Sequence, residues 1–287
     1  ASDVYKRQIL EEYGNHPSFI LMCNGNENEG NFNVLEDLVK KAQKHDNRRL
    51  YSASTARTHT PSDQYYVSHV TEKGWITVYE GKPSTDWDRK KESDIDCPVI
   101  AHETGQRCMY PNFAEMEKYT GVVSPRNFEV FRERLDEKGL LPLAEDYFKC
   151  SGKLAVQCYK EEMEAVFRSR LLGGFQILDI QDFSGQGTAL VGVLDAFMDS
   201  KELITDSEWR EFCNDAVVMA RFDSYVIEAG SSFKAHTELC NYRPDLKDGK
   251  LICTLTLENG DVIGKVEKNF VAEGNYTDIC DVEFTLP

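Results

Sequence analysis

The sequence of 287 residues lacks any long hydrophobic run. No apolar stretch approaches the roughly 18 residues of a membrane-spanning helix, and the N-terminus lacks the basic, apolar and small-residue segments of a signal peptide. Internal repeats and low-complexity tracts are missing as well. The chain is therefore predicted to be a soluble globular protein, long enough for one large domain and one small domain.

Positive charge is scarce. The chain has 33 basic and 49 acidic residues, and its formal net charge is −16. A surface of this sign repels nucleic acids and anionic membranes. Neither is predicted as a partner.

The nine cysteines include no CxxC pair that would indicate half of a zinc site. We interpret them as free thiols, which persist best in a reducing compartment, and this favours a cytoplasmic location over export. An exported protein whose signal peptide preceded a missing N-terminus would show the same cysteine pattern.

The first residues suggest such a truncation. Asp3 to Gln8 resembles the in-frame translation of a transposon end used in preparing sequencing libraries; the alternative is an ordinary polar helix start. On the first interpretation, residues 1–8 are not native and give no information about the natural fold. The chain is then a piece of a longer protein whose natural match begins near Ile9.

Strand-like and helix-like segments alternate through residues 9–223. Apolar runs of the kind found in strands buried on both faces occur at 19–23, 98–101 and 173–180, and residues 50–53 provide a shorter candidate. Apolar residues at helical spacing predict helices over 34–45 and 154–171. This alternation predicts a parallel sheet covered by helices.

The pattern changes at about residue 224. Segments 232–240, 251–258 and 280–286 have strand length, and Asp248-Gly249 and Asn259-Gly260 are turn signals. Residues 224–287 are predicted to form a small all-β, sandwich-like domain.

Polar clusters follow three of the apolar runs in the first region. The carboxyl ends of parallel strands meet at one face of a barrel, where the loops build an active site. A single acid of this kind is usually a solvated loop residue, but the same placement after three strands favours a joint role. The clusters are Asn26-Glu27, His102-Glu103 and Gln181-Asp182.

These segments carry a family resemblance. The run HPSFILMCNGNE, ending at Glu27, resembles the fourth-strand signature of glycoside hydrolase family 2, the family of β-galactosidases, β-glucuronidases and β-mannosidases. The run PVIAHETG at 98–105 resembles the family's seventh strand, and residues 173–182 resemble its eighth. The resemblance covers residues 9–199. It implies a partial (β/α)8 TIM barrel, about strands four to eight, over residues 9–223.

The resemblance also implies roles for individual residues. Glu27 would be the general acid/base, Glu103 the nucleophile, and Asn26 the partner of the sugar 2-hydroxyl. Retaining hydrolases hold the two carboxyl groups about 5–5.5 Å apart, so that one attacks the anomeric carbon while the other protonates the leaving oxygen. Once the nucleophile is glycosylated, the acid ionises and activates water. No cofactor is implied.

Two positions depart from the family pattern. Many members carry tryptophan where this chain has Met22 and Leu178. Aromatic side chains elsewhere are candidates for the sugar-stacking role, although each is more often a core residue. Histidines His69 and His102 are candidates for substrate contacts, and their spacing does not indicate a metal site. The remaining substrate-binding candidates are Tyr66, Trp75, Trp87, Phe183, Gln181 and Asp182.

The resulting hypothesis is a retaining, exo-acting hydrolase, β-galactosidase-like, that removes a terminal β-linked sugar from a glycoside or oligosaccharide. Two alternatives stay open, an inactive carbohydrate-binding relative and an endo-acting β-glycanase. The intact glutamate pair argues against the first, and the extent of the pocket would decide the second. Because the strands before Phe19 are expected to be missing, we expect this chain alone to be inactive and poorly soluble without the N-terminal strands and domains of its full-length form.

Overall fold

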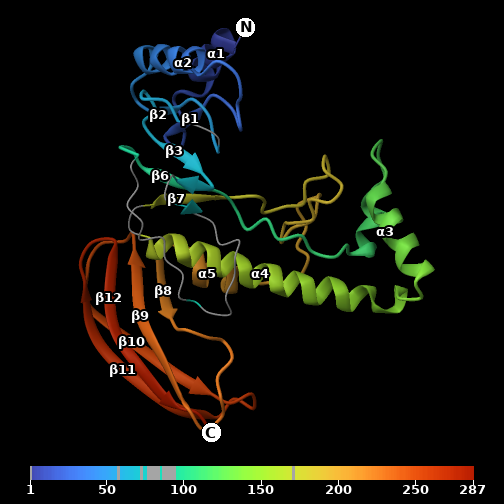
Figure 1. Ribbon diagram of the computed structural model, residues 1–287, viewed down its shortest axis with the longest axis vertical. Coiled ribbons are helices and arrows are strands. Elements are labelled where there is room, and N and C mark those ends of the chain that lie inside the picture. Colours follow the sequence, from blue (N-terminus) through green and yellow to red (C-terminus); the bar gives the residue numbers. More distant parts are fainter. Residues whose placement is uncertain (1, 57–58, 72–73, 76–84, 86–94, 170–171) are drawn as a thin grey trace. The chain divides into compact units, whose positions relative to one another are not determined.

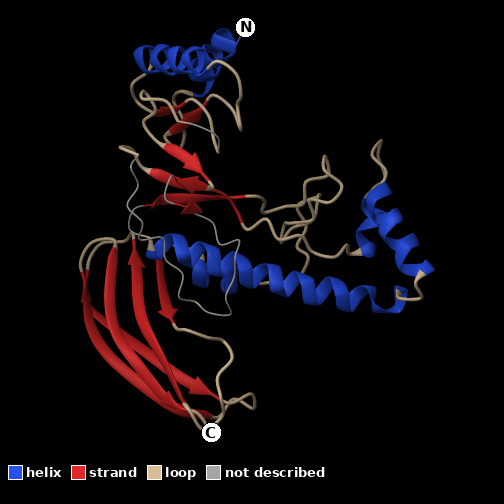
Figure 2. Ribbon diagram, viewed as in Figure 1, coloured by secondary structure: helices blue, strands red, loops and turns tan. Residues whose placement is uncertain are grey.

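The computed structural model describes residues 2–56, 59–71, 74–75, 85, 95–169 and 172–287 (Figure 1). The chain divides into two compact units: unit 1 comprises residues 1–77, 89–103 and 169–176, and unit 2 comprises residues 78–88, 104–168 and 177–287. Helices and several small sheets make the fold mixed α/β, as predicted (Figure 2). The described strands form no closed barrel.

Unit 1 begins with a small α/β layer. Its elements are α1 (Ser2–Tyr13), β1 (Leu21–Cys23), α2 (Phe32–His45) and β2 (Leu50–Ser52), and β1 and β2 pair in parallel. The side chain of Asn31 caps α2 by accepting a hydrogen bond from the Asn33 N–H. The apolar face of the helix then packs on the strands, because the core combines Leu10, Val39, Ala42, Tyr51 and Ala53.

Strand β1 is less buried than its apolar sequence predicted. All three of its residues are only partly buried, and the preceding Ile20 is exposed. The reason is its position, since β2 is its only partner among the described strands. A run that reads as buried on both faces is therefore an edge strand here.

The second sheet of unit 1 carries the proposed nucleophile. It has the order β3-β6-β7, with β3 at Tyr66–Ser68, β6 at Val99–Thr104 and β7 at Leu172–Ile177; a short hairpin, β4 (Val70–Thr71) with β5 (Gly74–Trp75), follows β3. Strands β3 and β6 are parallel, and Ser68 pairs with Ala101. The prediction that β6 ends at Ala101 was wrong, because the strand continues through His102 and Glu103.

Unit 2 contains the helices α3 (Arg126–Glu137), α4 (Ala144–Arg168) and α5 (Asp206–Phe212), and the 3-10 segments Phe113–Lys118 and Leu141–Leu143. Helix α4 begins at Ala144 rather than Leu154. Two acids in its first turn, Glu145 and Asp146, favour this start because they face the positive end of the helix dipole. Its buried face includes Tyr159 and Met163.

Two antiparallel sheets form the rest of unit 2. One has the order β12-β9-β8, with β8 at Ala216–Arg221, β9 at Ser232–Asn241 and β12 at Tyr276–Thr285; the other pairs β10 (Leu246–Thr256) with β11 (Val262–Ala272). A shared apolar cluster joins them, because Ala235, Val282 and Phe284 pack with Cys253 and Val266. The first of these sheets begins with β8, which precedes residue 224, where the sequence pattern changes.

Of the two predicted turns, one is confirmed. Gly260 has a φ of +91° and its N–H donates to the Leu257 carbonyl, as a tight hairpin turn requires. The prediction of a turn at Asp248-Gly249 was wrong. These residues lie inside β10, where the register against β11 shifts, so the Asp-Gly signal marks an irregularity in a continuous strand.

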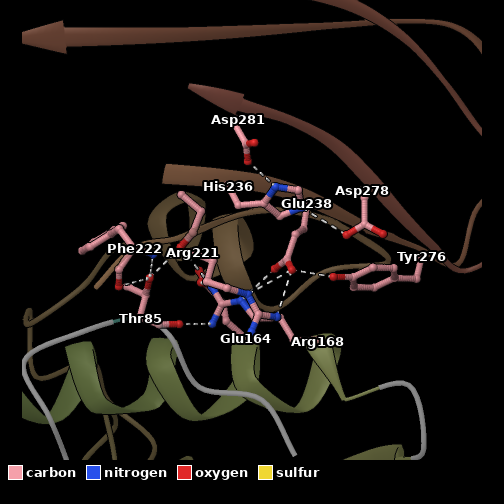
Figure 3. Close-up of polar contacts among 11 residues, drawn as sticks. Thr85, Glu164, Arg168, Arg221, Phe222, His236, Glu238, Tyr276, Asp278 and Asp281 are labelled. Atoms are coloured by element: carbon pink, nitrogen blue, oxygen red, sulfur yellow. Dashed lines mark hydrogen bonds and ion pairs between the residues drawn. The ribbon is translucent and has the colours of Figure 1, made fainter. Parts of the chain in front are cut away.

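A buried ionic network links α4 to β9 and β8 (Figure 3). The Arg168 guanidinium, 0% exposed, lies 3.0 Å from Glu238 Oε2 and 2.7 Å from Glu164 Oε2. Arg221 lies 2.9 Å from the other Glu238 oxygen, to which the Tyr276 hydroxyl also donates. Two buried acids are therefore neutralised here, Glu238 by both arginines and Glu164 by Arg168 together with Lys160.

Replacing Arg168 by Met should lower the free energy of unfolding by about 3–5 kcal/mol, because it removes the one fully buried cation that contacts both buried carboxylates. Urea unfolding measures the change. The matched control is Arg126→Met, since Arg126 is exposed and its pairs with Glu129 and Glu133 lie at the surface; the loss there should be about 0–1 kcal/mol. Equal losses in the two variants would contradict the role of burial.

All nine cysteines are free thiols, as predicted. Within the described residues, no helix is both long and apolar enough to cross a membrane.

Candidate active site

Hydrogen bonds connect the loop after β1 to the loop after β2. Asn26 forms a parallel bridge with Thr55 and accepts a hydrogen bond from its hydroxyl. The N–H of Glu27 donates to Thr55 Oγ1 (3.3 Å), and the N–H of Asn28 donates to Ser54 Oγ (2.8 Å). Both hydroxyl residues are buried. The exposed Asn26-Glu27 pair is thereby held on a fixed backbone.

Both glutamates predicted to be catalytic have an unusual backbone conformation. Glu27 has a φ of +49° and Glu103 a φ of +51°, in the left-handed region that favours glycine. Such a conformation costs of order 1–3 kcal/mol and persists where the surrounding structure imposes it, often at active sites. Each glutamate thus occupies a strained position at or just past the end of a strand.

Two histidines contact the Glu103 carboxylate. His69 Nε2 lies 3.1 Å from Oε2, and His102 Nε2 lies 3.3 Å from Oε1. The side chains of His69, His102 and Glu103 are 16%, 7% and 20% exposed. The register of β3 and β6 explains the cluster. Because Ser68 pairs with Ala101, the residues that follow them, His69 just past β3 and His102 on β6, come side by side with ring centroids 4.8 Å apart.

His102 also connects the two strand ends. Its Nε2 lies 3.0 Å from Asn26 Oδ1, and its Nδ1 lies 3.3 Å from Gln176 Oε1. Burial lowers the pKa of His102, although the neighbouring Glu103 carboxylate acts in the opposite direction. A mostly neutral imidazole at neutral pH has one N–H to donate, so the ring orients Asn26 and Glu103 without adding a full positive charge.

The third predicted cluster lies in unit 2. Asp182 is buried, with Lys201 Nζ 2.6 Å from Oδ2 and the Gly192 N–H donating to Oδ1 at 3.0 Å. Burial raises the pKa of Asp182, and Lys201 opposes the shift. Both carboxylate oxygens are therefore engaged by the protein itself, and Gln181 forms a backbone bridge to Leu194.

The aromatic candidates are dispersed. Tyr66 is buried in β3 with its ring 5.2 Å from that of His59, so it has little exposed surface for a sugar. Phe183 is exposed. Trp75 belongs to β5, and Trp87 lies outside the described residues.

Sequence reasoning missed two residues of the site. Thr55 follows β2 as Glu27 follows β1, so the rule that polar residues past strand ends build the site could have found it. Gln176 lies within β7, and no pattern marks it. Of the residues predicted for the site, the structure brings together Asn26, His69, His102 and Glu103, with Glu27 held beside them through Thr55.

A second buried acid lies near Asp182. Glu115, in the 3-10 segment Phe113–Lys118, is 4% exposed, and its Oε1 has no hydrogen-bond partner in the described part of the chain. Burial raises its pKa to about 7, with Lys201 opposing the shift. The folded protein thus retains a proton that the unfolded chain releases.

This proton makes stability depend on pH. Because the folded pKa of Glu115 exceeds the unfolded value of 4.5, its contribution to stability falls by about 2–3 kcal/mol as pH rises from about 4.5 through 7 and is constant above. Glu115→Gln, which imitates the protonated form, should lack this loss. The measurement is urea unfolding of both proteins at pH 5 and pH 8. A wild-type minus variant difference that stays the same at the two pH values would contradict it.

Comparisons with known proteins give matches at the level of structure only. No protein-family model and no curated protein matches the sequence. Similar solved structures include a β-glucuronidase from glycoside hydrolase family 2 (12% identity, TM-score 0.38) and the β-glucuronidases of Parabacteroides merdae (11%, 0.39) and Bacteroides uniformis (13%, 0.35). They match 99%, 99% and 100% of this chain, which spans 28%, 38% and 33% of theirs. These three solved structures are glycoside hydrolases.

Proposed function

We propose that this chain is the catalytic part of a retaining, exo-acting glycoside hydrolase that removes a terminal β-linked sugar, with β-galactosides as the first substrates to test. The observation that carries the proposal is the constellation of two strand-end glutamates, Glu27 and Glu103, both with left-handed backbone, around a shared Asn26–His102 contact. The three strand motifs in the sequence support the same assignment.

In the first step, the Glu103 carboxylate attacks the anomeric carbon while Glu27 donates its proton to the departing oxygen. The bond to the leaving group breaks as the bond to Glu103 forms. His69 and His102, each within about 3.3 Å of a Glu103 oxygen, fix the direction of the carboxylate. Such positioning lowers the barrier because the reacting atoms are already aligned.

In the second step, Glu27 takes a proton from water, and the water oxygen displaces Glu103 from the sugar. Two inversions give retention of configuration. Asn26 would bind the sugar 2-hydroxyl through its NH2 group, because its Oδ1 already accepts from Thr55 and lies 3.0 Å from His102. Hydrogen bonds to this hydroxyl strengthen in the transition state.

We also propose that strands preceding β1 complete a barrel and the sugar-facing side of the site. The supporting observation is that β1 and β7 are both edge strands in the described part of the chain, whereas a closed barrel pairs its first and last strands. The activity is proposed for that complete form.

A panel of aryl β-glycosides tests the function. The N-terminally extended protein should hydrolyse at least one of the β-galactoside, β-glucuronide and β-mannoside, whereas the 287-residue chain alone should show no measurable turnover and poor solubility. No hydrolysis of any aryl glycoside by the extended form would contradict the function. A soluble, monomeric 287-residue chain with comparable turnover would contradict the proposed completion of the barrel.

A further inference from the structure

The cluster around Glu103 has a second chemical capacity. His69, His102 and Glu103 each offer one ligand atom, and these three atoms all lie within 4.8 Å of one another. Two imidazole nitrogens and one carboxylate oxygen form the three-ligand set typical of zinc sites that keep an open fourth position. No sequence motif marks this ligand set, because His69 follows β3, whereas His102 and Glu103 lie on the neighbouring parallel strand β6.

The distances agree with one small cation. A tetrahedral zinc ion with bonds of about 2.0–2.2 Å holds neighbouring ligand atoms about 3.3–3.5 Å apart. The two histidines already contact the carboxylate at this spacing, one at each oxygen: His69 Nε2 lies 3.1 Å from Oε2 and His102 Nε2 lies 3.3 Å from Oε1. Among the three ligand atoms, one from each residue, every distance is at most 4.8 Å, so each must shorten by about 1.5 Å or less to reach the tetrahedral spacing. Small rotations of the partly exposed His69 and Glu103 side chains supply such a movement.

The surroundings favour a cation as well. His102 Nδ1 lies 3.3 Å from Gln176 Oε1, so when a metal ion binds Nε2, the ring proton can move to Nδ1 and be donated to that oxygen. Outer hydrogen bonds of this kind orient metal-binding histidines. We propose that His69, His102 and Glu103 bind Zn²⁺ through His69 Nε2, His102 Nε2 and the Glu103 carboxylate.

The other cluster of potential ligands is a poorer candidate and serves as a control. His236, Glu238 and Asp278 also present atoms within 4.8 Å of one another, on β9 and β12 (Figure 3). However, Arg168 and Arg221 already neutralise Glu238. Their positive charges would repel a metal ion, so we expect no tight binding there.

Zinc binding does not depend on the glycosidase proposal, but its consequence does. A bound ion would occupy the carboxylate that we propose as the nucleophile. Zn²⁺ should therefore inhibit hydrolysis reversibly, and a chelator should restore it.

Calorimetric titration with Zn²⁺ and absorption spectroscopy with Co²⁺ test the site without a substrate, on the chain in whichever form is soluble, alone or N-terminally extended. We expect one tight equivalent of Zn²⁺ and a Co²⁺ spectrum of low coordination number. His69→Gln and Glu103→Gln, tested separately, should each weaken Zn²⁺ binding by more than about tenfold. Loss of a residue that only supports a ligand already costs about 10- to 100-fold in metal affinity, and loss of a ligand should cost at least as much. His236→Gln should bind as the wild type does.

Circular dichroism shows whether each variant is folded, and if His69→Gln is not, Glu103→Gln decides. Binding that is unchanged in both variants would overturn the proposal. So would a thiolate-to-cobalt charge-transfer band, because the nine free cysteines would then be the ligands, or the absence of binding at millimolar Zn²⁺.

Discussion

Glu103→Gln should lower kcat on an aryl β-glycoside by about 10⁴- to 10⁶-fold, the loss seen when a nucleophile that acts with its partners is removed. The amide preserves the shape of the side chain but cannot form the covalent intermediate. The glutamine side chain can keep its contacts with His69 and His102, so the fold should be preserved. Steady-state kinetics on the extended protein give the measurement, with unfolding curves as the check on folding.

Chemical rescue makes this prediction specific. In Glu103→Ala the carboxylate is absent, and azide can occupy its place and attack the anomeric carbon directly, giving a glycosyl azide of inverted configuration. Glu29→Gln, a change of an exposed acid in the loop that holds Glu27, is the matched control and should keep turnover within a few-fold of the wild type. Near-wild-type turnover by the Glu103 variants would remove Glu103 from the mechanism.

Glu27→Ala should have the second largest effect. Loss of a general acid/base costs about 10²- to 10⁴-fold in kcat, and the loss should depend on the leaving group. A phenol of low pKa departs without protonation, so its glycoside should lose little in the first step, whereas an alkyl glycoside should lose the full factor. Kinetics on a series of aryl and alkyl glycosides measure this dependence.

Azide gives the opposite stereochemical outcome in Glu27→Ala. The covalent intermediate on Glu103 still forms, and azide attacks it in place of activated water, so the glycosyl azide should have retained configuration. Rate losses that are independent of the leaving group would show that Glu27 does not protonate it. An inverted azide product would mean that the roles of Glu27 and Glu103 are exchanged.

Local patterns predicted much of the secondary structure. Helix α2 and strand β2 follow from apolar spacing over a few residues, and the structure has them within two residues of the predicted bounds. Helix α5 was missed although its start is written in the sequence, since Thr205 and Glu208 form a capping box. The burial of β1 could not be predicted from its own residues, because burial depends on which strands lie beside it.

The candidate site was predicted in part for the same reason. A polar residue next to an apolar strand is a local signal, and it gave Asn26, Glu27 and Glu103 as candidates. Contacts between strands are not local: His69 and Glu103 are 34 positions apart, and only the register of β3 and β6 brings them together. The zinc-like ligand set was missed because its residues share no sequence motif.

In the proposed mechanism, Glu103 becomes covalently attached to the sugar. A 2-deoxy-2-fluoro glycoside with a good leaving group tests it most directly, because fluorine at C2 slows breakdown of the intermediate and removes the hydroxyl that Asn26 would bind. Mass spectrometry of a protease digest should show the fluorosugar on the peptide that carries Glu103, with the label absent in Glu103→Gln. Label on a different residue, or full turnover of normal substrate with no label on any peptide, would contradict the account.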